Sequence, residues 1–165
     1  MKIPRAVAAG VLGTVVVIAV VWLGGLASRQ DADICALLGA SVTEVRGAWT
    51  WVLGLALQLV IGIVAAIVYA AIFEWVTRRA GVLVGFIVAV GHAVIAGLAV
   101  GFLPAARLIE AATTPPGAFM EYRGPLVVVA FVIAHLAFGT IIGLLYGRPR
   151  HAVVARRVVW HEVEV

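Results

Sequence analysis

The stretch Gly124–Gly147, GPLVVVAFVIAHLAFGTIIGLLYG, decides how the rest of the chain is interpreted. Its 24 residues contain no charged side chain and are bounded by an arginine on each side. About 20 apolar residues are enough for a helix to cross a bilayer. On such a helix, the positions i, i+4, i+8 and i+11 form one narrow polar or small-residue face: His135, Gly139, Gly143 and Tyr146. The stretch predicts a membrane-spanning helix whose polar and small-residue face contacts other helices rather than lipid.

The composition indicates that lipid surrounds most of the chain. Of 165 residues, 64% are hydrophobic and 12% are charged, whereas a soluble domain carries about 25% charged residues. The net charge of +4 and the pI near 10.0 could indicate nucleic-acid binding. The basic residues, however, lie at the ends of apolar runs, as in membrane proteins, so we predict no nucleic-acid partner. The single cysteine, Cys35, has no partner for an internal disulfide.

Four uncharged stretches are long enough to cross a bilayer: residues 6–28, 47–73, 80–106 and 124–147. They predict an all-α integral membrane four-helix bundle, a single membrane domain over residues 1–165 with a cytoplasmic tail at 148–165. The first stretch also has features of a signal peptide, because Lys2 and Arg5 precede it and Gly25-x-Ala27 resembles a cleavage site. Its apolar body exceeds the usual ~7–15 residues, which favours a retained span.

The distribution of charge predicts the orientation of these spans. Lysine and arginine gather before the first span, between the second and third, and after the fourth, whereas the loops 29–46 and 107–123 carry both signs. Because cytoplasmic loops are enriched in lysine and arginine, we predict a multi-pass bacterial inner-membrane protein with both termini in the cytoplasm. In the first outer loop, residues 33–42 could form a short interfacial helix capped by Asp31 or Asp33.

A shift of 77 residues superposes the second span on the fourth. Residues 44–70 and 121–147 are identical at 7 of 27 positions, including Gly62 over Gly139 and Tyr69 over Tyr146. This pattern predicts two tandem two-helix repeats. Two spans per unit preserve direction across the membrane, so the halves would be related by an axis along the membrane normal.

Small residues follow one face of every span, and helices in lipid associate through such faces. The bundle is therefore expected to be compact, and the same faces could mediate a homo-oligomer or a larger membrane complex. The residues of these faces are Ala6, Gly10, Thr14 and Gly25; Gly54, Gln58, Gly62, Ala65 and Ala66; Gly81, Gly85, Ala89, His92 and Ala96; and His135, Gly139 and Gly143.

Two motifs carry a family resemblance. The last span contains His135-x3-Gly139-x3-Gly143-x2-Tyr146-Gly147, and the first outer loop contains Asp33-Ile34 followed by Leu38-Gly39. With Gly62 and Tyr69 of the second span, the pattern resembles a group of small bacterial four-helix membrane proteins that have no assigned activity. The resemblance covers most of residues 5–147 and implies the four-helix architecture but no chemistry. In that group the second span often has a histidine where this chain has Gln58.

His92 and His135 are the sharpest candidates for a functional site, because each lies near the middle of its span and intramembrane ionisable residues are usually functional. Two imidazoles at equal depth on neighbouring helices could ligate haem b or a transition metal, or line a proton or ion path. They could equally be neutral groups whose hydrogen bonds fix the bundle. No Cys, Met or carboxylate lies near mid-depth, which favours this structural interpretation.

The remaining polar residues of the spans have simpler expected roles. Gln58 is the other strongly polar side chain at mid-depth and is expected to hydrogen-bond between helices. With Gln58, Gly62, Gly139 and Gly143, the two tyrosines Tyr69 and Tyr146 are counted in the packing or polar core of the bundle. Both lie at the inner ends of their spans, where anchoring in the headgroup region is their plain expected role. Glu74 is expected to pair with an arginine one turn away.

The sequence contains no recognised catalytic constellation. The only serines, Ser28 and Ser41, lie far from any histidine, and the only lysine is Lys2. We therefore predict a non-enzymatic accessory or scaffold subunit without a cofactor. The alternatives are a haem- or metal-binding bundle that uses His92 and His135, and a small permease or proton path.

Overall fold

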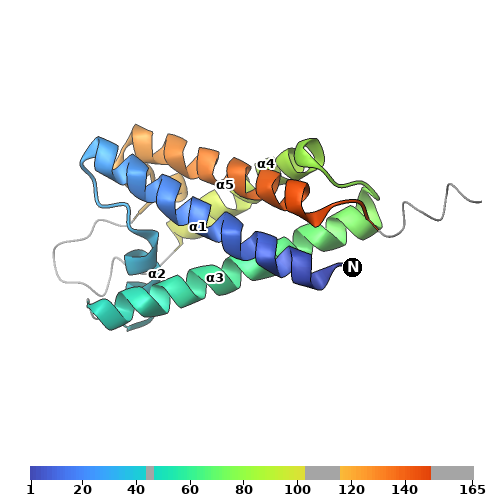
Figure 1. The fold of residues 1–165 in the computed structure, drawn as a ribbon. Coiled ribbons are helices and arrows are strands. Elements are labelled where there is room, and N and C mark those ends of the chain that lie inside the picture. Colours follow the sequence, from blue (N-terminus) through green and yellow to red (C-terminus); the bar gives the residue numbers. More distant parts are fainter. Residues whose placement is uncertain (44–46, 103–115, 150–165) are drawn as a thin grey trace, which may run out of the picture.

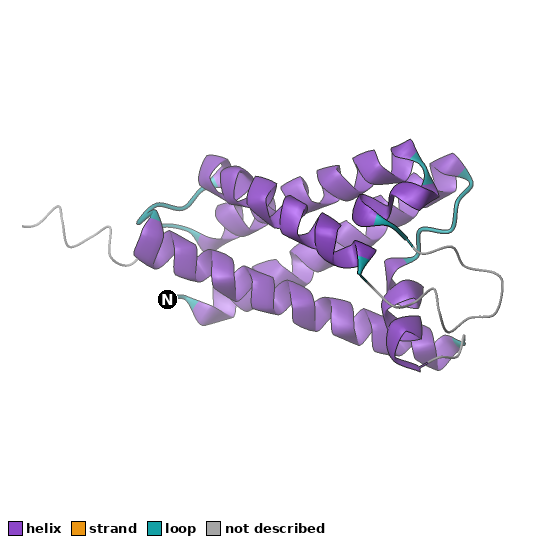
Figure 2. Ribbon diagram, turned by 180° about the vertical axis from the view of Figure 1, so that it is seen from behind, coloured by secondary structure: helices purple, strands orange, loops and turns teal. Residues whose placement is uncertain are grey.

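The described part of the chain is entirely helical. The computed structural model describes residues 1–43, 47–102 and 116–149, and no strand occurs in these ranges. A π-helical turn, η1 (Ile72–Val76), continues the third helix, and a 3-10 segment, η3 (Ala118–Arg123), precedes the last. Figures 1 and 2 show the five α-helices from opposite sides: α1 (Ile3–Ser28), α2 (Ile34–Thr43), α3 (Ala48–Ala71), α4 (Val82–Gly101) and α5 (Pro125–Tyr146).

Four of these helices are long and apolar enough to cross a membrane: Ile3–Ser28, Ala48–Val76, Val82–Gly101 and Pro125–Tyr146. They agree with the predicted spans to within a few residues, except that α4 ends at Gly101. The last predicted residues of that span, 103–106, lie outside the described residues, as do residues 150–165 of the predicted tail. Exposed valine, leucine, isoleucine and phenylalanine side chains cover the outer faces of the long helices. The fold is therefore compatible with a multi-pass membrane protein.

The helices pack in the lateral order α3, α1, α5, α4. α1 packs along α5, α3 packs along α1, and α4 packs along α5, whereas α3 and α4 do not pack along each other. α3 and α5 converge toward the end that holds the N-terminus and diverge toward the other end, where α2 packs against α3 (Figure 1). The bundle is therefore open along the edge between α3 and α4, rather than compact on all sides as expected.

This arrangement lacks the symmetry that two tandem repeats predict. A two-fold axis would superpose α1 on α4 and α3 on α5, so α3 would contact α4 as extensively as α1 contacts α5. Only the pairs within each half are alike, because α1 packs on α3 and α4 packs on α5. The sequence repeat stays a prediction, and the two halves meet asymmetrically.

Glycines set the distance between neighbouring helices. A Cβ atom at Gly62 of α3 would overlap the hydroxyl of Thr14 on α1, and one at Gly85 of α4 would overlap the carbonyl of Gly139 on α5. The helix backbones can approach this closely only because these positions have no side chain. Such contacts are how helices associate in lipid, where apolar side chains gain nothing by leaving the solvent.

The two ends of the bundle differ in charge. One end holds the N-terminus, the α3–α4 connection and the end of α5, where the Lys2 ammonium donates a hydrogen bond to the Arg148 carbonyl. Apart from the buried Glu74, the described charged side chains at this end are basic: Lys2, Arg5, Arg78, Arg79 and Arg148. The opposite end carries both signs: Arg29, Asp31, Asp33, Glu121 and Arg123.

The short helix α2 begins where the sequence predicts. The Asp33 carboxylate accepts hydrogen bonds from the backbone N–H groups of Cys35 and Ala36, both at 3.0 Å. This is an N-cap, which satisfies donors that have no partner within the helix. The same carboxylate accepts a 2.9 Å hydrogen bond from the indole of Trp51 on α3. Asp33 therefore starts α2 and also ties it to α3.

Two glycines of α4 offer a matched test of this packing. Gly85 faces α5, where a Cβ would collide with backbone, whereas Gly91 has nothing within 4 Å of the same position. We expect Gly85→Ala to lower the free energy of unfolding by about 1–3 kcal/mol, because α4 and α5 must separate. Gly91→Ala should change it by no more than about 0.5 kcal/mol. Unfolding of both variants in mild detergent, followed by circular dichroism, compares them, and equal losses would contradict the packing.

Candidate polar site inside the bundle

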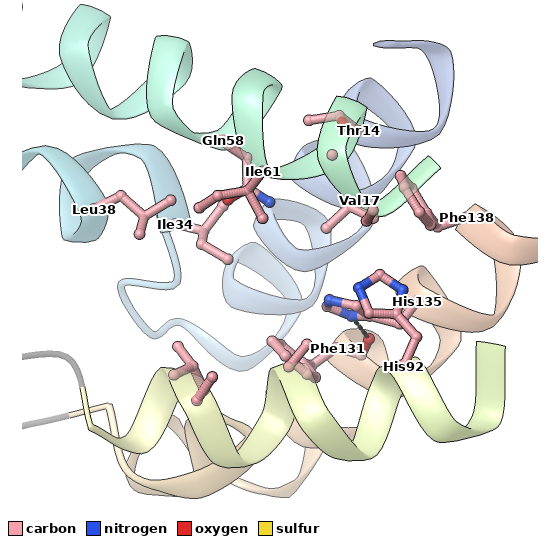
Figure 3. Close-up of a pocket in the computed structure, with 15 residues that line it drawn as sticks. Thr14, Val17, Ile34, Leu38, Gln58, Ile61, His92, Phe131, His135 and Phe138 are labelled. Carbon is pink, nitrogen blue, oxygen red and sulfur yellow. Dashed lines mark hydrogen bonds between the residues drawn. The ribbon is translucent and has the colours of Figure 1, made fainter. Parts of the chain in front are cut away.

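A cavity of about 160 Å³ lies inside the bundle, and side chains from all five helices line it (Figure 3). Its wall is mainly apolar, with Ile34 and Leu38 of α2 placing it toward the end of mixed charge. Ile61 of α3 and Ala99 of α4 line the cavity and are also exposed on the outside of the bundle. The cavity therefore opens along the edge where α3 and α4 do not pack together. The polar side chains on its wall are Thr14, Gln58, His92 and His135.

His135 is held on α5 in one orientation. Its side chain is buried, and its ring lies 4.2 Å from the ring of Phe131, centroid to centroid. The ring nitrogen Nδ1 lies 2.8 Å from the Phe131 carbonyl oxygen. A carbonyl oxygen can only accept, so Nδ1 donates this hydrogen bond, and Nε2 of the neutral ring keeps an unprotonated lone pair. His135 therefore offers a hydrogen-bond acceptor.

His92 lies beside His135 on the neighbouring helix α4. The two imidazoles meet edge to face, with centroids 5.3 Å apart and planes at 76°. Nδ1 of His92 is 3.3 Å from the hydroxyl of Tyr69 on α3, so this side chain connects α3 to α4. The structure thus brings together the two histidines that the sequence analysis singled out, with Tyr69 as a third member.

Gln58 has a different environment from the one expected. Its side chain is only 8% exposed and lines the cavity on α3 (Figure 3). The predicted hydrogen bond between helices is not formed, because no described residue bonds the Gln58 amide. The nearby Thr14 hydroxyl instead donates to the Gly10 carbonyl within α1, at 2.7 Å. Leaving a buried amide without a partner costs about 1–3 kcal/mol, so Gln58 is an unusual residue in this bundle.

The glycines predicted to mediate packing lie at helix contacts. Gly62 contacts α1, Gly139 contacts α4 at Gly85, and Gly143 contacts Gly85 and the cap residue Gly81. Gly139 also lies against the hydroxyl of Tyr69. Gly139 and Gly143, one and two turns after His135, therefore allow α4 and α5 to touch.

Tyr69 and Tyr146 are buried within the bundle, in keeping with a packing or polar core, and they are not exposed at its end as anchoring in the headgroup region would require. Both rings are buried, with 2% and 0% of their surface exposed. The Tyr146 hydroxyl donates a 2.6 Å hydrogen bond to Oε1 of Glu74, which is itself 1% exposed. It also accepts a 3.1 Å bond from the backbone N–H of Lys2. Each tyrosine follows a packing glycine by seven residues, two helical turns, and this spacing was the signal that it faces inward.

Glu74 has a partner that the sequence analysis missed. The pairing expected for it is with an arginine one turn away, and the structure places it inside the bundle on η1, where it accepts a hydrogen bond from Tyr146. The N-terminal ammonium of Met1 lies 3.9 Å from the same carboxylate oxygen. Glu74, Tyr146 and the N-terminus therefore join the ends of α1, α3 and α5 at the basic end of the bundle.

A haem does not fit between His92 and His135. A haem with two axial histidines has its flat macrocycle between two imidazoles that both point at the iron. Here the two rings contact each other directly, and the helices that carry them touch through Gly85 and Gly139, about one to two turns away. The direct contact of the two rings leaves no space for a macrocycle between them.

A transition-metal site has an incomplete set of ligands. Among the described residues, no group of three or more His, Cys, Asp or Glu side chains lies close enough to hold a metal ion. His92 and His135 alone supply half of a tetrahedral set. Nothing in the arrangement therefore favours metal binding over the hydrogen-bonding roles of the two rings.

Comparison with known proteins gives no assignment for this site. No protein-family model matches the chain, and no curated protein or solved structure matches it either. The resemblance to small bacterial four-helix proteins stays a prediction from the sequence. Function has to be argued from the geometry of the bundle and its cavity.

The buried pair of Tyr146 and Glu74 can be tested by removing one hydroxyl. We expect Tyr146→Phe to lower the free energy of unfolding by about 1–3 kcal/mol, because a buried carboxylate loses a hydrogen-bond donor. Tyr122, which is 60% exposed at the opposite end, supplies the control Tyr122→Phe, with a change below about 0.5 kcal/mol. Thermal or denaturant unfolding in detergent measures both. A Tyr146→Phe variant as stable as the parent would show that the hydrogen bond contributes nothing.

Proposed function

We propose that this chain is a non-enzymatic accessory or scaffold subunit of the bacterial inner membrane. The observation that carries this proposal is the open bundle. α3 and α4 each pack along one long helix only, and they are less buried than α1 and α5. Their remaining faces are apolar along the whole span, which suits contact with lipid and with other membrane helices.

The chemistry of the interior agrees with a role other than catalysis. The hydroxyl of Tyr69 is engaged with His92, and Nδ1 of His135 is engaged with a backbone carbonyl. Ser28 and Ser41 also hydrogen-bond backbone carbonyls of their own helices. Neither serine donates its hydroxyl to a histidine or a carboxylate, which is the arrangement that activates a serine nucleophile.

A proton path receives less support than an accessory role. The hydrogen bonds form two separate clusters, one of Tyr69 with His92 and one of Tyr146 with Glu74. The aromatic ring of Phe73 lies between the two tyrosines, 6.1 Å from Tyr69 and 5.6 Å from Tyr146, centroid to centroid. A phenylalanine ring neither donates nor accepts a proton, so the described residues form no continuous relay.

The proposal includes kinship with the small bacterial four-helix proteins and an origin by duplication. Gly62 and Gly139, which correspond in the sequence repeat, each contact the first long helix of their own half. Tyr69 and Tyr146, which also correspond, both direct a hydroxyl to a partner inside the bundle. These parallels support a common origin of the halves, followed by divergence of the contact between them.

We propose that both termini face the cytoplasm, because the end that holds the N-terminus carries the basic residues. Single cysteines at the two ends test this. Gln30→Cys should react with a membrane-impermeant maleimide in intact cells, whereas Ala80→Cys should react only after permeabilisation.

The parent chain is the control for this labelling. Cys35 is buried, and burial, together with the nearby Asp33 carboxylate, raises the pKa of its thiol to about 11. The raised pKa keeps the thiol protonated at neutral pH, and a protonated thiol is unreactive. Labelling of Ala80→Cys in intact cells, with Gln30→Cys protected, would reverse the proposed orientation.

The accessory role predicts a stable assembly in the native membrane. Protein extracted in a mild detergent should migrate in native mass measurements as a complex of defined composition, larger than one 17.3 kDa chain. Chemical cross-linking in intact membranes, before extraction, checks that the complex is not formed in detergent. A strictly monomeric chain that cross-links to nothing would contradict the proposal.

A further inference from the structure

Three polar groups face the cavity without a partner among the described residues: the amide of Gln58 and the Nε2 atoms of His92 and His135. Gln58 is 8% exposed and His135 is 6% exposed, so more than nine tenths of each residue is enclosed by the bundle, and their free polar atoms border the cavity. In an apolar bundle such groups are stabilised only when something in the cavity bonds them. The wall of the cavity therefore indicates a ligand with hydrogen-bonding atoms.

The size and walls of the cavity limit what this ligand can be. A dry apolar cavity of about 150 Å³ accommodates one benzene ring, and this cavity measures about 160 Å³. The rings of Phe131 and Phe138 form part of its wall, and aromatic rings pack favourably against one another. A single six-membered ring matches both the volume and the lining.

The cavity is reached from the side of the bundle. Its lining residues Ile61 and Ala99 are exposed along the edge between α3 and α4, and both belong to helices long and apolar enough to cross a membrane. A ligand that enters by this edge comes from the lipid phase. Any chain attached to its ring would lie along the apolar faces of α3 and α4.

The polar atoms select the chemistry of the ring. Nε2 of His135 is an acceptor, because Nδ1 donates to the Phe131 carbonyl, so the ligand must present a donor. The Gln58 amide can both donate and accept, and it lies on α3, across the cavity from the imidazoles on α4 and α5 (Figure 3). A phenolic hydroxyl donates to a histidine nitrogen, and a second hydroxyl at the opposite ring position points toward Gln58.

We propose that this cavity binds the phenolic ring of a membrane-soluble amphiphile, with its alkyl chain leaving between α3 and α4. An alkylphenol has one hydroxyl and would form a hydrogen bond only on the histidine side of the cavity. An alkylhydroquinone, which has the headgroup chemistry of a quinol, would form hydrogen bonds on the histidine side and with Gln58. The site is independent of the accessory role, because it lies within one chain.

The test uses three probes with the same alkyl chain: hexylhydroquinone, 3-hexylphenol and 3-hexylanisole, whose methylated oxygen has no hydrogen to donate. Binding is measured by titration calorimetry on protein in nanodiscs, with empty nanodiscs of the same lipid subtracted to remove partitioning. We expect saturable binding of one phenolic probe per chain, and at least tenfold weaker binding of the anisole. Hydroquinone binding tighter than phenol binding identifies the quinol form, and equal affinities identify the simple phenol.

Variants locate the binding in the cavity. Gln58→Leu should weaken hexylhydroquinone at least tenfold and raise the thermal midpoint of the empty protein, because an unpartnered amide is removed. His135→Phe should weaken both phenolic probes, and Ala96→Phe, which fills the cavity without removing a polar group, should abolish binding. Gly91→Ala, on the outer face of α4, should leave every affinity unchanged.

Three results would overturn the proposal. The first is the absence of saturable binding by either phenolic probe, and the second is binding of the anisole as tight as that of the phenol. Unchanged affinities in the folded Gln58→Leu and Ala96→Phe variants would also overturn it, because the probes would then bind elsewhere. The accessory role would stand in each case, since it is judged by cross-linking and native mass.

Discussion

Close approach of helix backbones is the interaction on which this structure depends. In lipid an apolar side chain gains nothing by leaving the solvent, so association rests on van der Waals contact and polar bonds. Glycines at the α1–α3 and α4–α5 contacts remove the side chains that would hold the helices apart. The polar bonds of the interior follow from this packing, because His92 meets His135 only where α4 and α5 touch.

Much of the architecture could be predicted from the sequence, because lipid imposes strict limits. The four spans follow from uninterrupted apolar length, and the start of α2 follows from an aspartate at the cap. The glycine faces follow from helical spacing, and the positions of Gly62, Gly85 and Gly139 at helix contacts agree with it. In each case residues close together in the sequence determine the length, the start or the contact face of a single helix.

The lateral order of the helices and the cavity could not be predicted in this way. Every span has a small-residue face, so the sequence does not show which pair of faces stays apart. Depth in the span suggests a headgroup anchor at Tyr69, but its seven-residue spacing from Gly62 determines the face on which it lies, and that face is buried. Glu74 was placed at the boundary for the same reason, although a carboxylate with a tyrosine hydroxyl beside it can be accommodated inside the bundle.

The cavity owes one part of its wall to α2. This short helix packs against α3 through Gly39 and Gly54, positions where a Cβ would collide with backbone, so it is held as tightly as a spanning helix. It lies at the end where α3 diverges from α5 (Figure 1), and its residues Ile34 and Leu38 form part of the cavity wall. The cap of α2 and its indole bond to α3 both depend on Asp33. The cavity that Gln58 and His135 line is therefore bounded at this end by a helix that packing and hydrogen bonds hold against α3.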